Sequence, residues 1–141
     1  MKKLAFIFAL AFSLLAGCGA QANGADANVN DNVNVKSNNS YIQISQQQAK
    51  EIMDKQPDAV VLDVREQHEY DEKHIVNAVL LPLGTINEEN AAKTIPSKET
   101  VVLVYCRSGN RSKTASSLLA ELGYTQVYEF GGIKDWQYDT E

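Results

Sequence analysis

Continuous apolar runs, rather than alternating apolar and polar positions, mark the main strands of this chain. Strands that are buried on both faces of a parallel sheet have this pattern, because neither side of the strand meets water. We predict such strands in the runs AVVLDV (59–64), AVLLPL (78–83) and VVLVY (101–105). The stretches YIQI (41–44) and TQVYEF (125–130) predict two further strands.

Helical patterns fall between these strands. Ser45 and Gln48 form a capping-box pair, which predicts a helix that starts there and runs to about Lys55. The helix predicted from Arg111 to Leu122 has an apolar face and stops at Gly123. Shorter helices are predicted over 67–73 and 87–93. The alternation of strands and helices indicates one open α/β domain with helices on both faces of its sheet.

The first 17 residues have the layout of an export signal. Two lysines precede an apolar run from Leu4 to Leu15, and small residues follow it. The run is too short for a membrane-spanning helix, which needs about 20 apolar residues. The stretch LAGC (15–18) resembles the lipobox of bacterial lipoproteins, where the cysteine is acylated with fatty acids such as palmitate. This resemblance implies a signal peptide over 1–17 and a mature chain lipidated at Cys18. An ordinary signal followed by an unmodified cysteine is the alternative.

Residues 18–40 are the predicted tether between the lipid and a domain over 41–141. Residues 19–40 contain seven asparagines and no aromatic residue, so they have little apolar surface to bury and are expected to be disordered. The lipid would be the only attachment to a membrane. We expect the protein in the cell envelope, outside the cytoplasm, on a periplasmic or outer surface, and the sequence leaves open which membrane holds it.

Charge and cysteine content narrow the classes of partner. Without the signal peptide, 11 basic residues remain against 18 acidic ones, a net charge near −7, which argues against nucleic acid as a partner.

Lipidation of Cys18 would leave Cys106 unpaired, and an unpaired cysteine in an exported protein is a candidate reactive thiol. With two histidines and one free cysteine, we expect neither a metal site nor a cofactor.

Cys106 lies between a predicted strand and a predicted helix, at the sheet edge where open α/β proteins bind ligands. The loop 107–112 can turn its backbone N–H groups inward, and Gly109 allows a positive φ. The positive end of the next helix points to the same place. With Arg107 and Arg111 nearby, these groups are expected to lower the pKa of Cys106 and to attract a small anion. The alternatives are a small buried residue at a strand end and a solvated helix start.

The loop CRSGNRS (106–112) is similar to those of two enzyme groups with this strand–loop–helix design. Cysteine-dependent phosphatases use Cys-x5-Arg, whereas four residues separate Cys106 from Arg111 here. The shorter loop resembles that of the rhodaneses, which are sulfurtransferases. VLDVREQHEYDEKHIVNAVLLPL (61–83) and GGIKDW (131–136) resemble the other two signatures of that family. Lys73-His74 and Val76-Asn77 depart from the common Gly-His and Pro-Gly, in a connecting turn.

The resemblance to rhodaneses implies a mainly parallel five-stranded sheet and a thiosulfate sulfurtransferase-like enzyme. A sulfane sulfur would pass from thiosulfate or polysulfide to a thiol or cyanide through a persulfide on Cys106, without a cofactor. The partners are then a small anionic sulfur donor and a thiol acceptor, and we expect a monomer. Arg107 and Arg111 would orient the donor, unless one of them braces the loop. The resemblance implies that backbone N–H groups of the loop hold the charge of the persulfide, so the residues expected at the substrate are Arg107, Ser108, Gly109, Asn110, Arg111 and Ser112.

Other residues of the matched stretches are expected to have structural roles. Asp63, Arg65 and Glu69 are spaced to form an ion-pair and hydrogen-bond set that supports the end of a strand. His74 is expected to be packed and hydrogen-bonded, and His68 to face solvent. Ser112 is expected to cap the helix rather than to touch the substrate.

Three questions stay open at this point. Ser108 stands where thiosulfate-specialised rhodaneses often carry a second basic residue, so polysulfide or another persulfide is an alternative donor. A phosphatase or arsenate reductase of the same fold is a second alternative, although the loop length argues against it. The third is a non-enzymatic, tethered sulfur carrier or binding module. Such modules commonly lack the cysteine, which is present here.

Overall fold

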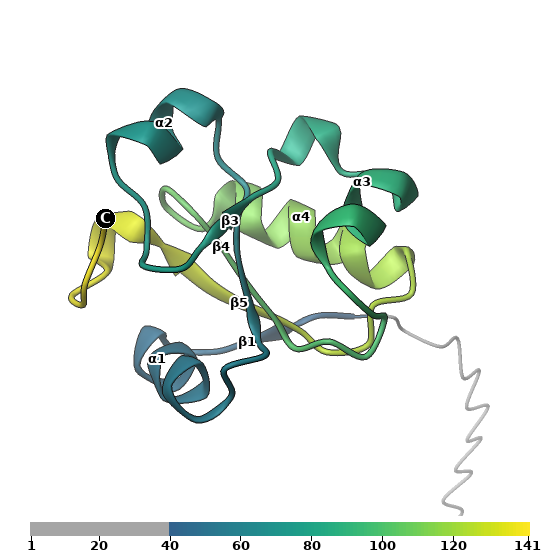
Figure 1. The fold of residues 1–141 in the computed structure, drawn as a ribbon, viewed down its shortest axis with the longest axis horizontal. Coiled ribbons are helices and arrows are strands. Elements are labelled where there is room, and N and C mark those ends of the chain that lie inside the picture. Colours follow the sequence, from purple (N-terminus) through teal and green to yellow (C-terminus); the bar gives the residue numbers. More distant parts are fainter. Residues whose placement is uncertain (1–39) are drawn as a thin grey trace, which may run out of the picture. The chain divides into compact units, whose positions relative to one another are not determined.

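The computed structural model describes residues 40–141, and Figure 1 shows their fold. The predicted signal peptide (1–17), the lipidation site Cys18 and the tether up to residue 39 lie outside the described residues. Within the described part, no helix has the length and apolar character needed to cross a membrane.

Five parallel strands form a single sheet in the order β1-β5-β4-β2-β3. Their bounds are Ile42–Gln43 for β1, Val60–Asp63 for β2, Val79–Leu80 for β3, Val102–Cys106 for β4 and Val127–Gly132 for β5. The predicted fold class, a mainly parallel five-stranded α/β sheet, is therefore confirmed. The strand predicted over 78–83 is shorter than expected: Pro82 has no N–H for a ladder and precedes the 3₁₀ turn η1 (Leu83–Thr85).

Four α-helices connect the strands: α1 (Gln46–Lys55), α2 (Gln67–Glu72), α3 (Glu88–Thr94) and α4 (Asn110–Glu121). A second 3₁₀ turn, η2 (Ile133–Asp135), follows β5. The predicted capping box starts α1, since the Ser45 hydroxyl accepts from the N–H of Gln48 at 3.1 Å and the Gln48 side chain accepts from Ser45 N–H at 2.9 Å. Gly123, with φ 92°, follows the end of α4 as expected.

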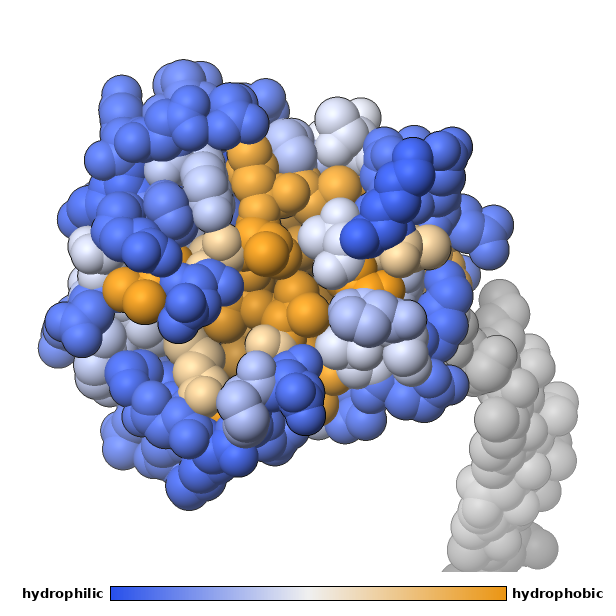
Figure 2. Space-filling view, in the orientation of Figure 1, coloured by the Kyte–Doolittle hydropathy of each residue, from blue (hydrophilic) through white to orange (hydrophobic). Residues whose placement is uncertain are grey.

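Both faces of the central strand β4 are buried, which explains its continuous apolar sequence. Val102, Val104 and Cys106 pack in one cluster with residues of α3 and α4, whereas Leu103 and Tyr105 pack in another with residues of α1 and β5. Helices therefore cover both faces of the sheet (Figure 1). Figure 2 shows hydrophobic residues gathered in the middle of the view, between the hydrophilic surfaces of α1, α2 and α3.

The carboxyl ends of β4 and β5 meet in an irregular pairing that shapes the loop after Cys106. The register shifts between Val104 and Cys106, so that Cys106 pairs with Gly132. A Cβ atom added to Gly132 would lie 2.1 Å from the carbonyl oxygen of Arg107 and 2.5 Å from the backbone nitrogen of Ser108. Only glycine therefore allows the loop backbone to approach β5 this closely.

We predict that Gly132→Ala displaces this loop, because the methyl group collides with backbone atoms rather than with a movable side chain. The expected loss in free energy of unfolding is about 1–3 kcal/mol, as for other overpacked sites, with slower alkylation of Cys106. Gly84→Ala is the matched control, since a Cβ at Gly84 has no neighbour within 4 Å. Urea denaturation of both variants is the measurement, and equal unfolding free energies would contradict the prediction.

Candidate active site

Cys106 is the last residue of β4, and its side chain is only 1% exposed. The backbone N–H of Gly109 donates a hydrogen bond to its sulfur at 3.1 Å, and the hydroxyl oxygen of Ser112 lies 3.5 Å from the same atom. Gly109 is the N-cap of α4 and has φ 100°, the positive value predicted for it. The first turn of α4 therefore contacts the thiol through a backbone N–H group and a side-chain hydroxyl.

The surroundings of Cys106 lower its pKa. Burial alone would raise the pKa of the thiol, but its hydrogen bonds with the Ser112 side chain and with the backbone N–H groups of Ser112, Ser108 and Gly109 outweigh it. These donors favour the thiolate, which is the nucleophilic form. The lowering is thus in the predicted direction, and its source is mainly the hydrogen bonds of the loop.

Arg111 braces the loop against α2. Its two guanidinium nitrogens donate to the two carboxylate oxygens of Glu69, at 2.6 and 2.8 Å. The expectation that Glu69 joins Asp63 and Arg65 in one ion-pair set is wrong, because its carboxylate is turned toward α4 and holds Arg111 instead. Of the two arginines in the loop, Arg107 is the one with an exposed side chain.

Asp63 and Arg65 form the rest of the predicted set. The Arg65 guanidinium donates to the Asp63 carboxylate at 2.6 and 3.0 Å, and the backbone N–H of Arg65 donates to it at 2.9 Å. A further bond from Arg65 reaches the carbonyl oxygen of Lys73 at 2.7 Å. The pair is buried and ties the end of β2 to the chain that follows α2, in agreement with a supporting role.

Ser112 does not cap α4, which corrects the sequence-based expectation. The N-cap is Gly109, and the buried Ser112 hydroxyl donates to Glu129 Oε1 at 2.6 Å and lies 2.9 Å from the Gly109 carbonyl oxygen. Glu129 belongs to β5, is 2% exposed, and was not recognised in the sequence as part of the site. A carboxylate within an apolar strand, two residues before Gly131-Gly132, is the signal that could have identified it.

The two histidines have the surroundings that were predicted for them. His74 Nδ1 is 2.9 Å from the carbonyl oxygen of Tyr70, and the rings of these residues stack at 3.7 Å. His68 is exposed. The side chains of Ser108 and Asn110 are also exposed, and neither has a hydrogen-bond partner among residues 40–141. In the same range, no cluster of His, Cys, Asp and Glu side chains could hold a metal ion.

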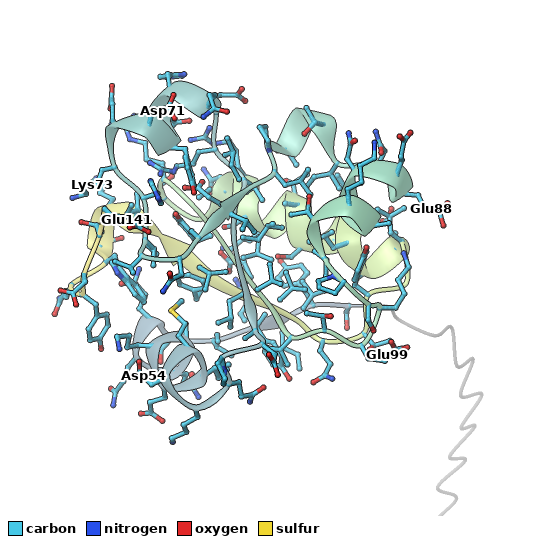
Figure 3. The ribbon with its side chains drawn as sticks, viewed as in Figure 1. Asp54, Asp71, Lys73, Glu88, Glu99 and Glu141 are labelled. Atoms are coloured by element: carbon cyan, nitrogen blue, oxygen red, sulfur yellow. The ribbon has the colours of Figure 1, made fainter. Side chains whose placement is uncertain are left out.

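A cavity of about 590 Å³ opens beside the cysteine loop. Its lining consists of Arg65, His68, Glu69, Glu72, Lys73, Arg107, Ile133 and Lys134. No ion pair within the described part of the chain involves Lys73, Arg107 or Lys134. Figure 3 shows Lys73 after α2, on the side of the molecule where Glu141 also lies. Glu72 is the one carboxylate of the lining without an ion pair among the described residues, so the three cations leave a net positive charge for an anion that approaches the loop.

This chain is similar to known proteins in both sequence and fold. A family model described as Rhodanese-like domain matches residues 45–139. The thiosulfate sulfurtransferase PspE of Escherichia coli is 39% identical over 74 residues, which are 52% of this chain and 70% of the relative. The thiosulfate sulfurtransferase GlpE of Coxiella burnetii is 39% identical over 98 residues, 69% of this chain and 88% of the relative. A solved structure described as a rhodanese with anions from E. coli has a TM-score of 0.55 and 35% identity, over 59% of this chain and 96% of that one.

We predict that the Glu69–Arg111 pair loses its stabilising effect in acid. Hydrogen bonds from Arg111 hold the pKa of Glu69 at about 2, below its usual value of 4.5, although burial opposes this shift. A lowered carboxylate pKa stabilises the folded state above about pH 5, and the effect disappears as the pH falls toward 2. Glu69→Gln should therefore lower the free energy of unfolding by about 1–3 kcal/mol at pH 7, with a smaller difference at pH 3.

Urea denaturation at both pH values measures this effect. Glu72→Gln is the matched control, because Glu72 lines the same cavity on the same helix, is exposed, and forms no ion pair within the described residues. A loss of stability in Glu69→Gln that is as large at pH 3 as at pH 7 would exclude the ion pair as its cause.

Proposed function

The chain belongs to the rhodanese-like domain family, and we propose that it is a sulfurtransferase that carries the transferred sulfur on Cys106. The observation that supports this most directly is the environment of the thiol. Its sulfur is buried, accepts a hydrogen bond from Gly109 N–H, lies beside the Ser112 hydroxyl and has a lowered pKa. These features favour the thiolate form inside a small cradle of hydrogen-bond donors.

In the first step, the Cys106 thiolate attacks the outer sulfur of thiosulfate or of a polysulfide. A bond forms between the two sulfur atoms, and the bond from the outer sulfur to the rest of the donor breaks. Sulfite, or a polysulfide shortened by one sulfur, leaves with the electron pair. Backbone N–H groups of the loop hold the negative charge on the terminal sulfur, which is the kind of fixed stabilisation that usually dominates such sites.

In the second step, a thiolate or cyanide attacks the terminal sulfur, and the Cys106 thiolate leaves. The donors that lower the thiol's pKa also make Cys106 a better leaving group, because they stabilise the same anion. One set of hydrogen bonds therefore serves both half-reactions.

The cavity beside the loop supports an anionic donor. Arg107 and Lys134 line it without an ion-pair partner within residues 40–141, so their charges are available to thiosulfate or polysulfide. Arg111 is held by Glu69, and we therefore assign it the bracing role and Arg107 the donor-orienting role. Four residues between Cys106 and Arg111 give a cradle suited to one sulfur atom rather than to a phosphoryl group.

We expect the intact mass of the protein to rise by one sulfur atom after incubation with thiosulfate. Cyanide should reverse the gain, and Cys106→Ser should not show it, because the serine hydroxyl stays protonated at neutral pH. A mass gain with polysulfide but not with thiosulfate would support the same transfer chemistry with polysulfide as the donor. A protein that gains sulfur but transfers it to neither cyanide nor a free thiol would instead be a non-enzymatic sulfur carrier. No gain with either donor would refute the proposal, and a phosphate-ester assay then tests the phosphatase alternative.

We further propose that lipid on Cys18 attaches the protein to a membrane in the cell envelope, as the LAGC sequence at 15–18 indicates. In a bacterial host that expresses the full chain, the membrane fraction should contain the wild-type protein with incorporated palmitate label. Cys18→Ala should lose both the label and the membrane fraction, because a mature chain without acyl chains has no apolar anchor to bury in the membrane. Cys106→Ser is the control for loss of a cysteine and should stay membrane-bound. Equal fractionation of all three proteins would refute the anchor.

A further inference from the structure

The cavity beside the cysteine loop is much larger than an inorganic sulfur donor requires. Its volume is about 590 Å³, within the range of roughly 300–1,000 Å³ in which proteins bind organic ligands. A thiosulfate ion is built around a single S–S bond of about 2 Å, so it fills only a small part of this space. The cavity therefore has room for an organic molecule next to the loop.

The unpaired positive charges of the cavity belong to separate elements of its wall. Lys73 follows α2, Arg107 follows β4, and Lys134 lies in η2 after β5. None of the three takes part in an ion pair within residues 40–141. Because each element contributes its own cation, the wall suits a ligand with several anionic groups better than one compact ion.

A fourth basic side chain on the wall is buried and has donors to spare. Arg65 is 5% exposed, and its Nε and Nη2 atoms donate to Asp63 and to the carbonyl oxygen of Lys73. No hydrogen bond among the described residues uses Nη1. In the same range, Ser116 Oγ is the one buried side-chain N or O atom without a partner, so Nη1 is open to solvent. Since Arg65 lines the cavity, Nη1 can donate to an anionic group there.

The charge of the whole molecule favours a small ligand over an acidic protein at this cavity. The chain has 18 acidic and 13 basic residues, a net charge of −5, so it repels a negatively charged protein at a distance. A small anion can enter the cavity, where three unpaired cations stand against one unpaired carboxylate, that of Glu72. Ile133 on the same wall offers apolar surface to a carbon skeleton.

We propose that this cavity binds the sulfur acceptor, and that the acceptor is a small organic thiol with at least two anionic groups, such as carboxylates. Because Cys106 must carry the sulfur, the inference rests on the proposed function. The thiolate of the acceptor attacks the terminal sulfur of the persulfide, and a bond forms between these two atoms. The bond from that sulfur to Cys106 Sγ breaks, and the cysteine thiolate leaves with the electron pair. The acceptor becomes a persulfide, and the step needs no oxidant or reductant.

The first test compares two acceptor peptides that differ in charge: acetyl-Asp-Cys-Asp-amide has two carboxylates, and acetyl-Asn-Cys-Asn-amide has none. The protein is loaded with sulfur, separated from the donor and mixed with each peptide, and its intact mass reports the loss of sulfur over time. At pH 8 and about 0.01 M salt, the acidic peptide should react about tenfold faster at equal thiolate concentration. At about 1 M salt this preference should largely disappear, because salt screens the charges. Equal rates at low salt would overturn the proposal.

Variants of the cavity wall test where the acceptor binds. Lys73→Gln and Lys134→Gln should each lower the ratio of the acidic to the neutral rate about two- to fivefold. Glu72→Gln should raise that ratio, because it removes a like charge. Lys113→Gln is the control for loss of an exposed lysine, since Lys113 lies on α4 outside the cavity lining and forms no ion pair within the described residues. An effect of Lys113→Gln as large as that of Lys73→Gln would assign the preference to the overall charge of the protein, against the proposal.

A peptide without a thiol tests occupancy of the cavity directly. Acetyl-Asp-Ser-Asp-amide should slow transfer to the uncharged cysteine peptide, whereas acetyl-Asn-Ser-Asn-amide at the same concentration and ionic strength should not. Absence of this inhibition would overturn the proposal.

Failure of this inference and failure of the proposed function give different results. A protein that gains no sulfur from thiosulfate or polysulfide refutes the proposed function, and the acceptor assignment falls with it. A protein that gains sulfur and transfers it to both cysteine peptides at the same rate retains the sulfurtransferase proposal and loses this inference alone.

Discussion

The contact between Gly132 and the peptide bond that follows Arg107 is the constraint on which the site depends. It fixes the loop across the end of β5, and the loop in turn directs the N–H of Gly109 at the sulfur of Cys106. Because all five strands are parallel, their carboxyl ends share one edge, and the β5 residues meet the start of α4 there. The geometry of the sulfur cradle is thus a property of backbone packing before any side chain contributes.

Two polar environments of different character flank the thiol. Behind it lie the Ser112 hydroxyl and the Glu129 carboxylate, both buried. Next to the cysteine loop lies an open cavity with Arg107 and Lys134 on its wall. The buried side contacts the sulfur through Ser112, and the open side presents cationic side chains to solvent. This separation allows the charge of the nucleophile and the attraction of an anion to depend on different residues.

Features encoded by neighbouring residues could be read from the sequence. The apolar runs of β2 and β4, the capping box at Ser45 and the loop 106–112 each depend on residues a few positions apart. The contacts of Arg111 with Glu69 and of Ser112 with Glu129 join residues 42 and 17 positions apart, and helix and strand packing decides them. The sequence therefore placed Cys106 correctly between a strand and a helix, but it assigned Glu69 to a set with Asp63 and Arg65 and Ser112 to a helix cap, and it gave Glu129 no role.

The depth of Cys106 also has a consequence for the proposed transfer, because it decides which sulfur atom an acceptor would meet. At 1% exposure, the sulfur of the cysteine lies below the protein surface. In the proposed persulfide, a second sulfur bonded to the cysteine would extend about 2 Å beyond it, so the loaded protein would present an atom that the empty protein does not have. Large thiols would then reach the terminal sulfur more easily than the cysteine beneath it. The depth of the cysteine would thus distinguish the loaded from the empty protein, and it would protect the empty protein from mixed disulfides with bulky thiols.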